Sequence, residues 1–178
     1  IDKGLPTGSI LIGDHGPELQ LWDGQPLAMS HRHHSHLASL YPFDTVDPWT
    51  NEAERELIEN SFQTWVRMGM GNWSGWCLPW ASILWARMHN GKRAALLLEE
   101  MARVFRTRGK ATTHDAVIKG FTTIANHPDI MQMDATMGAT AAVLEMLLHT
   151  TNGVTRVFPA IPENWEDAHF EGIRVPGA

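Results

Sequence analysis

The sequence is poor in several residue types, and each shortage excludes a class of protein. It holds one cysteine, Cys77, so no disulfide can form within the chain and a cysteine-rich zinc site is impossible. Lysine and arginine number 14 against 20 aspartates and glutamates, and the net charge of -6 argues against a nucleic-acid surface. No apolar run approaches the roughly 20 residues of a membrane-spanning helix. We therefore expect neither nucleic acid nor a membrane among its partners.

The remaining composition is that of a folded domain with an unusual aromatic content. Hydrophobic residues make up 43% of the chain and charged residues 19%, which is enough apolar material for a core. Eight tryptophans stand against one tyrosine. A tryptophan ring is a large flat apolar surface that serves in a core and also packs against the C–H faces of sugars. Both uses remain open at this point.

Helical periodicity dominates the middle of the chain. Residues 1–30 are rich in glycine and proline and are typical of a loop, with one short apolar stretch at residues 10–12. The spacing of apolar residues predicts helices over residues 33–40, 51–68, 76–89, 92–105 and 137–149. After Asn152-Gly153, residues 154–158 alternate like a strand, and residues 173–175 are expected to form a second one. The pattern predicts paired helices followed by the beginning of a small β module.

Four histidines and an arginine fall within six positions, at His31, Arg32, His33, His34 and His36. A metal site would use neutral imidazoles, but no acidic residue lies beside them and Arg32 would repel a cation. A polar wall is the alternative, in which these side chains hydrogen-bond to hydroxyl groups or carboxylates. A purely structural role, with histidines capping loops, is a third. These interpretations stay open at this point; Arg32, His33 and His36 are the candidates for substrate binding, and we expect no metal and no cofactor.

Asp134 is the candidate for acid–base chemistry. It is flanked by methionines and precedes a helix of small apolar residues, so we expect it at a loop-to-helix junction. There it is either an ordinary helix cap or a general base whose apolar neighbours restrict water. Rival carboxylates, in settings that we expect to be less enclosed, are Asp44, Asp47, Asp115, Asp129 and Glu18.

Two tryptophans, Trp73 and Trp76, lie on either side of the turn Ser74-Gly75 before the helix predicted at residues 76–89. Their rings either line a sugar pocket or fill the core. We include both among the substrate-binding candidates.

Several short motifs follow one another along nearly the whole chain. They are Leu19-Gln20-Leu21-Trp22, HRHHSHL at 31–37 followed by Leu40-Tyr41-Pro42, GWC at 75–77, LWAR at 84–87, HP at 127–128, QMDATMGAT at 132–140, EMLL at 145–148, and VFPAIP at 157–162 with Trp165. In this order they resemble segments of glycoside hydrolase family 95, which includes 1,2-α-L-fucosidases and α-L-galactosidases. The corresponding family segments read LQEW, HRHxSHL, GWSxAW, LWARL, HPPFQIDGNFGxT, AEMLLQS and LLPALPxxW.

The resemblance implies a mainly α fold: part of an (α/α)6 barrel of helical hairpins over residues 1–152, then the start of a C-terminal β domain at residues 153–178. It also implies an inverting glycosidase, in which one carboxyl group protonates the leaving oxygen and another activates water. The family's base corresponds to Asp134, and its sugar-contacting arginine and histidine correspond to Arg32 and His33. The general acid is expected upstream of this chain, together with two asparagines that orient the water.

The motifs also depart from the family pattern. Ala135-Thr136-Met137 stand where the family has Gly-Asn-Phe, Cys77 stands in place of a serine, and Ala81 in place of a lysine. These changes bear on the sugar and on activity. Two alternatives to a glycosidase remain: a non-catalytic carbohydrate-binding helical module, and a metal-dependent hydrolase built on the histidine cluster.

The expected partners follow from the same reading. An oligosaccharide or glycoconjugate is the expected substrate. Hairpins taken from a closed barrel expose apolar faces, so we expect either the missing upstream part of a parent chain or self-association to cover them. We expect the isolated chain to lack activity. From the resemblance alone, the parent protein is expected to be secreted or periplasmic.

Overall fold

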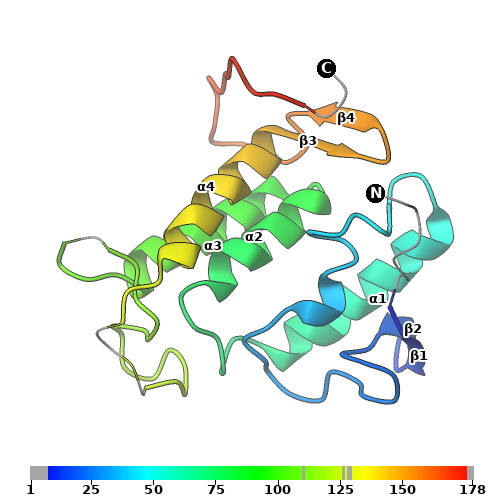
Figure 1. The fold of residues 1–178 in the computed structure, drawn as a ribbon, viewed down its shortest axis with the longest axis horizontal. Helices are drawn as coiled ribbons and strands as arrows, with labels where there is room; N and C mark the ends of the chain where they lie inside the picture. Colours follow the sequence, from blue (N-terminus) through cyan, green and yellow to red (C-terminus); the bar gives the residue numbers. More distant parts are fainter. Residues whose placement is uncertain (1–7, 110, 126, 128–129, 176–178) are drawn as a thin grey trace. The chain divides into compact units, whose positions relative to one another are not determined.

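The computed structural model describes residues 8–109, 111–125, 127 and 130–175. Among these residues, four α-helices, a 3-10 helix and two antiparallel two-stranded sheets follow one another along the chain (Figure 1). The chain divides into two compact units, Ile1–Asn72 and Trp73–Ala178. Within the described part, no helix combines the length and the apolar character needed to cross a membrane. The mainly helical class is confirmed, whereas the barrel stays a prediction because four helices cannot close such a ring.

The first unit contains β1 (Ile10–Gly13), β2 (Gly16–Leu19), the 3-10 helix η1 (Ser35–Leu37) and α1 (Glu52–Met68). The side chain of Asn51 caps α1 by accepting hydrogen bonds from two backbone N–H groups of the first turn, as its sequence position predicts.

One face of α1 forms the core of this unit. Leu57, Ile58, Phe62 and Trp65 recur at helical spacing, and each is at most 4% exposed. Strand β2 packs on the same helix, where the N–H of Leu19 donates to the Ser61 hydroxyl at 2.9 Å. The hydrogen bond matters because both groups are buried, and an unpaired N–H there would be costly.

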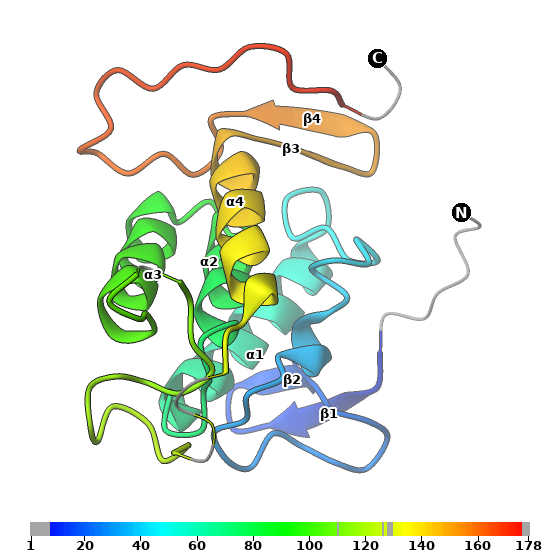
Figure 2. The ribbon, with the colours of Figure 1, turned by 60° about the vertical axis from the view of Figure 1, so that its left-hand side comes forward.

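The second unit is built on α2 (Cys77–Arg87), α3 (Gly91–Val104) and α4 (Met133–Leu147). Helix α2 lies between α3 and α4 (Figure 2). This position explains why α2 is apolar nearly all round, as expected for a helix buried on several sides. Alanines let the helices approach closely, and the resulting cluster contains Ala86, Ala94, Ala95, Met146 and Ala160.

Helix α4 leads directly into a hairpin of β3 (Leu148–Thr151) and β4 (Val154–Val157), whose turn is Asn152-Gly153. A buried polar group joins this hairpin to the helices. Arg87 forms an ion pair with Glu145 at 2.6 Å and donates to the Thr151 hydroxyl at 2.8 Å. The boundary expected between residues 152 and 153 falls on the turn of the hairpin, and the division into domains stays a prediction.

Four sequence expectations about elements were wrong. Residues 33–40 form only the short η1, because side chains there bond to neighbouring backbone and to other elements. The first 30 residues contain the β1–β2 hairpin, which is too short for a clear alternating pattern. Helix α4 begins at Met133, four residues earlier than expected, and ends at Leu147, two residues earlier than expected. Residues 173–175 are not a strand, because β4 pairs with β3 instead.

Candidate functional site

Burial divides the histidine cluster of the first unit into two groups. His31, Arg32 and His33 are exposed, whereas His34 and His36 are buried. The His34 ring accepts a hydrogen bond from the Trp65 indole at 3.2 Å and meets that ring edge-on. His34 is therefore a core residue, and the exposed surface of the cluster consists of the first three side chains.

The two histidines among the substrate-binding candidates of the cluster, His33 and His36, are neutral imidazoles near pH 7. Burial and, to a smaller extent, the charge of His31 together lower the pKa of His36 to about 4. The pKa of His33 is lowered by partial burial and then by the positive charges of Arg32 and His31. Both rings can then accept as well as donate hydrogen bonds. His36 is only 5% exposed, and its contact with sugar stays a prediction, like those of Arg32 and His33.

The cluster does not have the arrangement of a metal site. Within the part of the chain that the structure describes, no group of three or more histidine, cysteine, aspartate or glutamate side chains could hold a metal ion. The donors fail to converge because His34 and His36 are buried while their neighbours face outward.

The two tryptophans of the second unit have different environments. Trp73 is 4% exposed and belongs to the core. Trp76 is half-buried, and its ring stacks on Trp80 with centroids 5.3 Å apart. The N–H of Trp76 donates to the side-chain oxygen of Gln132 at 2.9 Å. This contact ties the start of α2 to the segment that leads into α4.

Gly75 lies where the turn before α2 meets the long loop between α3 and α4. Its N–H donates to the carbonyl oxygen of His114 at 3.1 Å. A Cβ atom on Gly75 would stand 2.2 Å from the carbonyl oxygen of Thr113, which no side chain tolerates. Glycine is therefore required for this close approach of the two backbones.

Two segments of the same loop, residues 112–114 and residues 130–132, are hydrogen-bonded to each other just before α4 begins. The N–H of Gln132 donates to the carbonyl of Thr112 at 3.1 Å, and the N–H of His114 donates to that of Ile130 at 2.8 Å. The Thr112 hydroxyl donates to the Gln132 carbonyl and lies 2.8 Å from the hydroxyl of Thr136 in the first turn of α4. These contacts fix the segment that carries Asp134 to the loop.

Asp134 is the second residue of α4 and is exposed. Gln132, not Asp134, occupies the cap position, and Asp134 Oδ1 accepts the N–H of Ala135 at 2.9 Å. The expected apolar enclosure was wrong, because Met133 and Met137 are 58% and 62% exposed. Residues three and four apart lie on one face of a helix, so Met133, Asp134 and Met137 share a face of α4, and this face is exposed to solvent.

The rival carboxylates were also expected to be less enclosed, and for three of them this was wrong. Glu18, Asp47 and Asp115 are 6%, 1% and 3% exposed. Asp129 lies outside the described residues. A carboxylate can be buried when hydrogen-bond donors surround it, which its neighbours in sequence do not reveal.

Asp115 has such donors. Its Oδ1 lies 2.5 Å from Nδ1 of His114, and its Oδ2 accepts the N–H of His127 at 2.7 Å. Burial by itself would raise the pKa of Asp115, but the hydrogen bonds from His114 and His127 outweigh it and hold the pKa below its ordinary value. Only the adjacent letters His-Asp in the sequence hinted at this pair.

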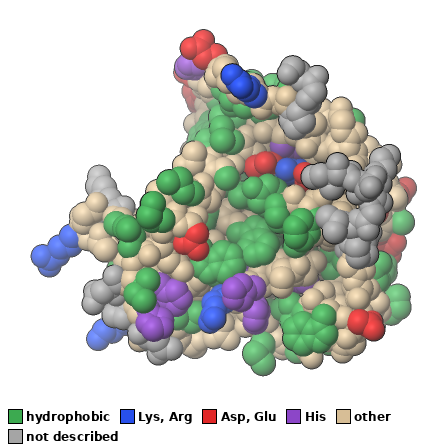
Figure 3. All heavy atoms as spheres, in the orientation of Figure 1, with side chains coloured by type: hydrophobic (Ala, Val, Ile, Leu, Met, Phe, Trp, Pro, Cys, Tyr) green, Lys and Arg blue, Asp and Glu red, His purple; other side chains and the backbone are tan. Residues whose placement is uncertain are grey.

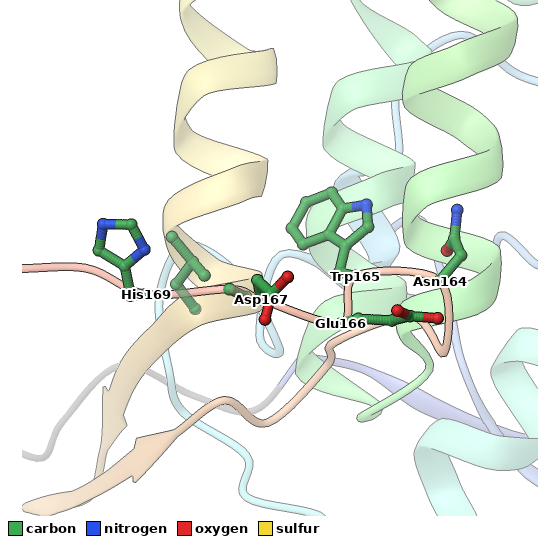
Figure 4. A pocket seen from close by; sticks show the side chains of 7 residues that line it. Asn164, Trp165, Glu166, Asp167 and His169 are labelled. Carbon is green, nitrogen blue, oxygen red and sulfur yellow. The ribbon is translucent and has the colours of Figure 1, made fainter.

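Hollows lie at both ends of α4 in the second unit. One of about 340 Å³ adjoins the Thr112–Thr136 contact and is lined by Met101, Ala102, Phe105, Arg106, Thr112, Thr136 and Ala139. The other, of about 630 Å³, is lined by Leu147 and residues 164–169, including Trp165, Glu166 and Asp167 (Figure 4). Asp134 and Leu147 are separated by about 20 Å of helix, so only the first hollow is near Asp134.

The chain was compared with known families. Residues 9–147 match the model of the glycosyl hydrolase family 95 catalytic domain. The chain belongs to glycosyl hydrolase family 95. The family match ends at Leu147, the last residue of α4, and therefore includes the histidine cluster, the turn at Gly75 and Asp134.

Two individual proteins are also similar to this chain. The chain is 31% identical over 148 residues to "Alpha-L-fucosidase 2" of Arabidopsis thaliana, with 83% of the chain covered. It is 27% identical over 190 residues to "Probable alpha-fucosidase A" of Aspergillus oryzae, with 99% covered. The chain spans 17% and 25% of the lengths of these two relatives.

Proposed function

We propose that this chain is the C-terminal part of the catalytic domain of an inverting glycoside hydrolase that acts on α-L-fucosides or α-L-galactosides. The observation that carries the proposal is the exposed carboxylate of Asp134 at the start of α4, within the region that matches the family. Both relatives are named as α-fucosidases, which supports a fucose-like substrate.

Asp134 is proposed as the general base. In an inverting reaction, the base takes a proton from water as the water attacks the anomeric carbon, while a second carboxyl group about 6.5–9.5 Å away protonates the leaving oxygen. The hydrogen bond from Ala135 orients one oxygen of Asp134 on the helix. Exposure leaves the carboxylate accessible to water and substrate. The second carboxyl group is proposed to come from a part of the full-length protein upstream of this chain.

Arg32 and His33 are proposed to hold the sugar. Their exposed side chains supply hydrogen-bond donors and, for the neutral imidazole, an acceptor, which suits hydroxyl groups. Trp76 is also proposed to bind the sugar, because its half-buried ring can serve as a platform for the apolar face of a sugar. Residues 1–152 are proposed as barrel, residues 153–178 as the start of a β domain, and the full-length protein as secreted or periplasmic.

Replacement of Asp134 tests the proposal. In the full-length protein, Asp134→Asn keeps the size of the side chain and removes the base, so kcat on aryl α-L-fucosides or α-L-galactosides should fall about 10²- to 10⁴-fold. Asp167→Asn, at another exposed aspartate of the second unit, should leave kcat unchanged. NMR of the first product should show the β-anomer from an α-linked substrate.

Three outcomes would contradict parts of this proposal. Full turnover by Asp134→Asn would remove it from the role of base. Retention of the α-anomer would exclude inversion. Sugar binding without turnover in the wild-type full-length protein would favour the non-catalytic binding module.

A further inference from the structure

In the hydrogen bond between His114 and Asp115, the histidine is the donor and the carboxylate is the acceptor. The pKa of Asp115 is held below its ordinary value, so its carboxylate is charged near neutral pH and only accepts hydrogen bonds. Nδ1 of His114 lies 2.5 Å from Oδ1 and must therefore carry the hydrogen. In the neutral imidazole, Nε2 is then a hydrogen-bond acceptor.

Both carboxylate oxygens of Asp115 are engaged in hydrogen bonds. Its Oδ2 accepts the N–H of His127, and its side chain is 3% exposed. The ring of His127 meets that of His114 edge to face, with centroids 5.5 Å apart, and supports the imidazole from one side. The histidine is thus held in one tautomer and one orientation, while 17% of its side chain remains exposed.

The backbone places His114 on the segment that pairs with the residues leading into α4. His114 bonds to Gly75 through its carbonyl and to Ile130 through its N–H. Side chains two residues apart in an extended segment face the same side, about 7 Å apart. Thr112 and His114 are such a pair, and the Thr112 hydroxyl contacts Thr136 in the first turn of α4.

We propose that His114 is a substrate-binding residue whose Nε2 accepts a hydrogen bond from a hydroxyl group of the saccharide that reacts at Asp134, with Asp115 as its positioning residue. This proposal rests on the proposed function. It explains why a buried carboxylate uses both of its oxygens to orient a partly exposed imidazole. An ion pair that only stabilised the fold would not require the ring to be exposed.

Replacement of His114 by asparagine or glutamine distinguishes the contributions of its two ring nitrogens. The amide of His114→Asn can replace Nδ1 as the donor to Asp115 but does not reach the place of Nε2. Loss of one hydrogen bond from bound substrate predicts that KM on an aryl α-L-fucoside rises about 5- to 10-fold, with little change in kcat. His114→Gln reaches the place of Nε2 with an acceptor oxygen and should restore KM in part. His169→Asn, at an exposed histidine, is the control.

Substrate analogues identify the contact. The full-length wild type and His114→Asn are compared on aryl α-L-fucosides that lack the hydroxyl at C2, C3 or C4. The penalty of His114→Asn should disappear for one analogue, the one without the bonded hydroxyl. A purely structural role would lower turnover on all analogues by the same factor and would lower Tm, and this result would overturn the proposal.

The inference and the proposed function fail in different ways. An active wild type with an unchanged KM in His114→Asn overturns the role of His114 alone. A wild-type full-length protein that neither hydrolyses these glycosides nor binds L-fucose or L-galactose overturns the proposed function and this inference with it.

Discussion

At the scale of single residues, burial assigns different roles to neighbours of the same type. His33 is exposed and His34 is buried, although they are adjacent in the sequence. Asp134 is exposed, whereas Asp115 is buried and held by two hydrogen bonds. A neutral imidazole is buried at moderate cost, but a carboxylate requires donors. The exposed members are therefore available for substrate, and the buried members support them or the core.

His149 predicts a pH dependence of stability at this scale. Its pKa is lowered to about 4, chiefly by burial and then by the charge of Arg87, against an ordinary value of 6.5. The unfolded chain takes up the proton first as pH falls, so this contribution to stability is present above pH 6.5 and is lost between pH 6.5 and 4. The loss amounts to about 3 kcal/mol of the free energy of unfolding.

The measurement compares His149→Asn with wild type by thermal unfolding of the full-length protein at pH 7 and pH 4.5. The asparagine amide can replace Nδ1 in its contact with the Glu145 carbonyl. The fall in Tm on acidification should be smaller in the variant, while His169→Asn should behave like wild type. An equal fall in wild type and His149→Asn would show that His149 does not contribute.

At the scale of elements, α2 and α4 form the contact that holds the site. Gly138 of α4 faces Pro79 of α2, and a Cβ atom at Gly138 would lie 3.2 Å from the proline ring. Gly138 has no side chain, which permits this close approach of the two helices. Because Asp134 stands one turn before Gly138, the distance between α2 and α4 sets the position of the proposed base.

Gly138→Leu should push the two helices apart. Overpacking of this kind costs about 1–3 kcal/mol of stability. The variant should lower Tm of the full-length protein and also kcat, because Asp134 moves with α4. Thr140→Leu, at an exposed position of the same helix, should change neither by much. A Gly138→Leu protein with wild-type Tm and kcat would refute the role of this contact.

At the scale of the whole molecule, one side of α4 is apolar and exposed. Met133, Met137 and Leu144 are 58%, 62% and 43% exposed. Hydrophobic side chains reach the surface in many places on the face drawn in Figure 3. The chain spans only 17% and 25% of the two relatives, so further helices of the full-length protein are the proposed cover for this surface.

The isolated chain of 178 residues should therefore lack glycosidase activity. The proposed general acid is outside it, and a base without an acid leaves the glycosidic oxygen unprotonated. The assay uses an aryl α-L-fucoside at concentrations of enzyme where the full-length protein gives a clear rate. Turnover by the isolated chain would contradict the absence of the acid.

Sequence by itself determined the features that depend on local periodicity. The spacing of apolar residues in 51–68 predicted α1. The motifs in order predicted the family that the comparison confirmed. Such features are local because a helix bonds each residue to one four positions away. Asp134 near a helix start was predicted for the same reason.

Only the tertiary structure decided which of these residues are enclosed and which neighbours orient them. Residues 148 and 149 were predicted at the end of a helix but form the start of β3, because β4 supplies the hydrogen-bond partner. Gly75, His114 and Gln132 are up to 57 positions apart, yet their contacts hold the turn of Asp134. Contacts of this range depend on how α2 and α4 pack, so periodicity does not contain them. The proposed base came from the motif, and its surroundings came from the fold.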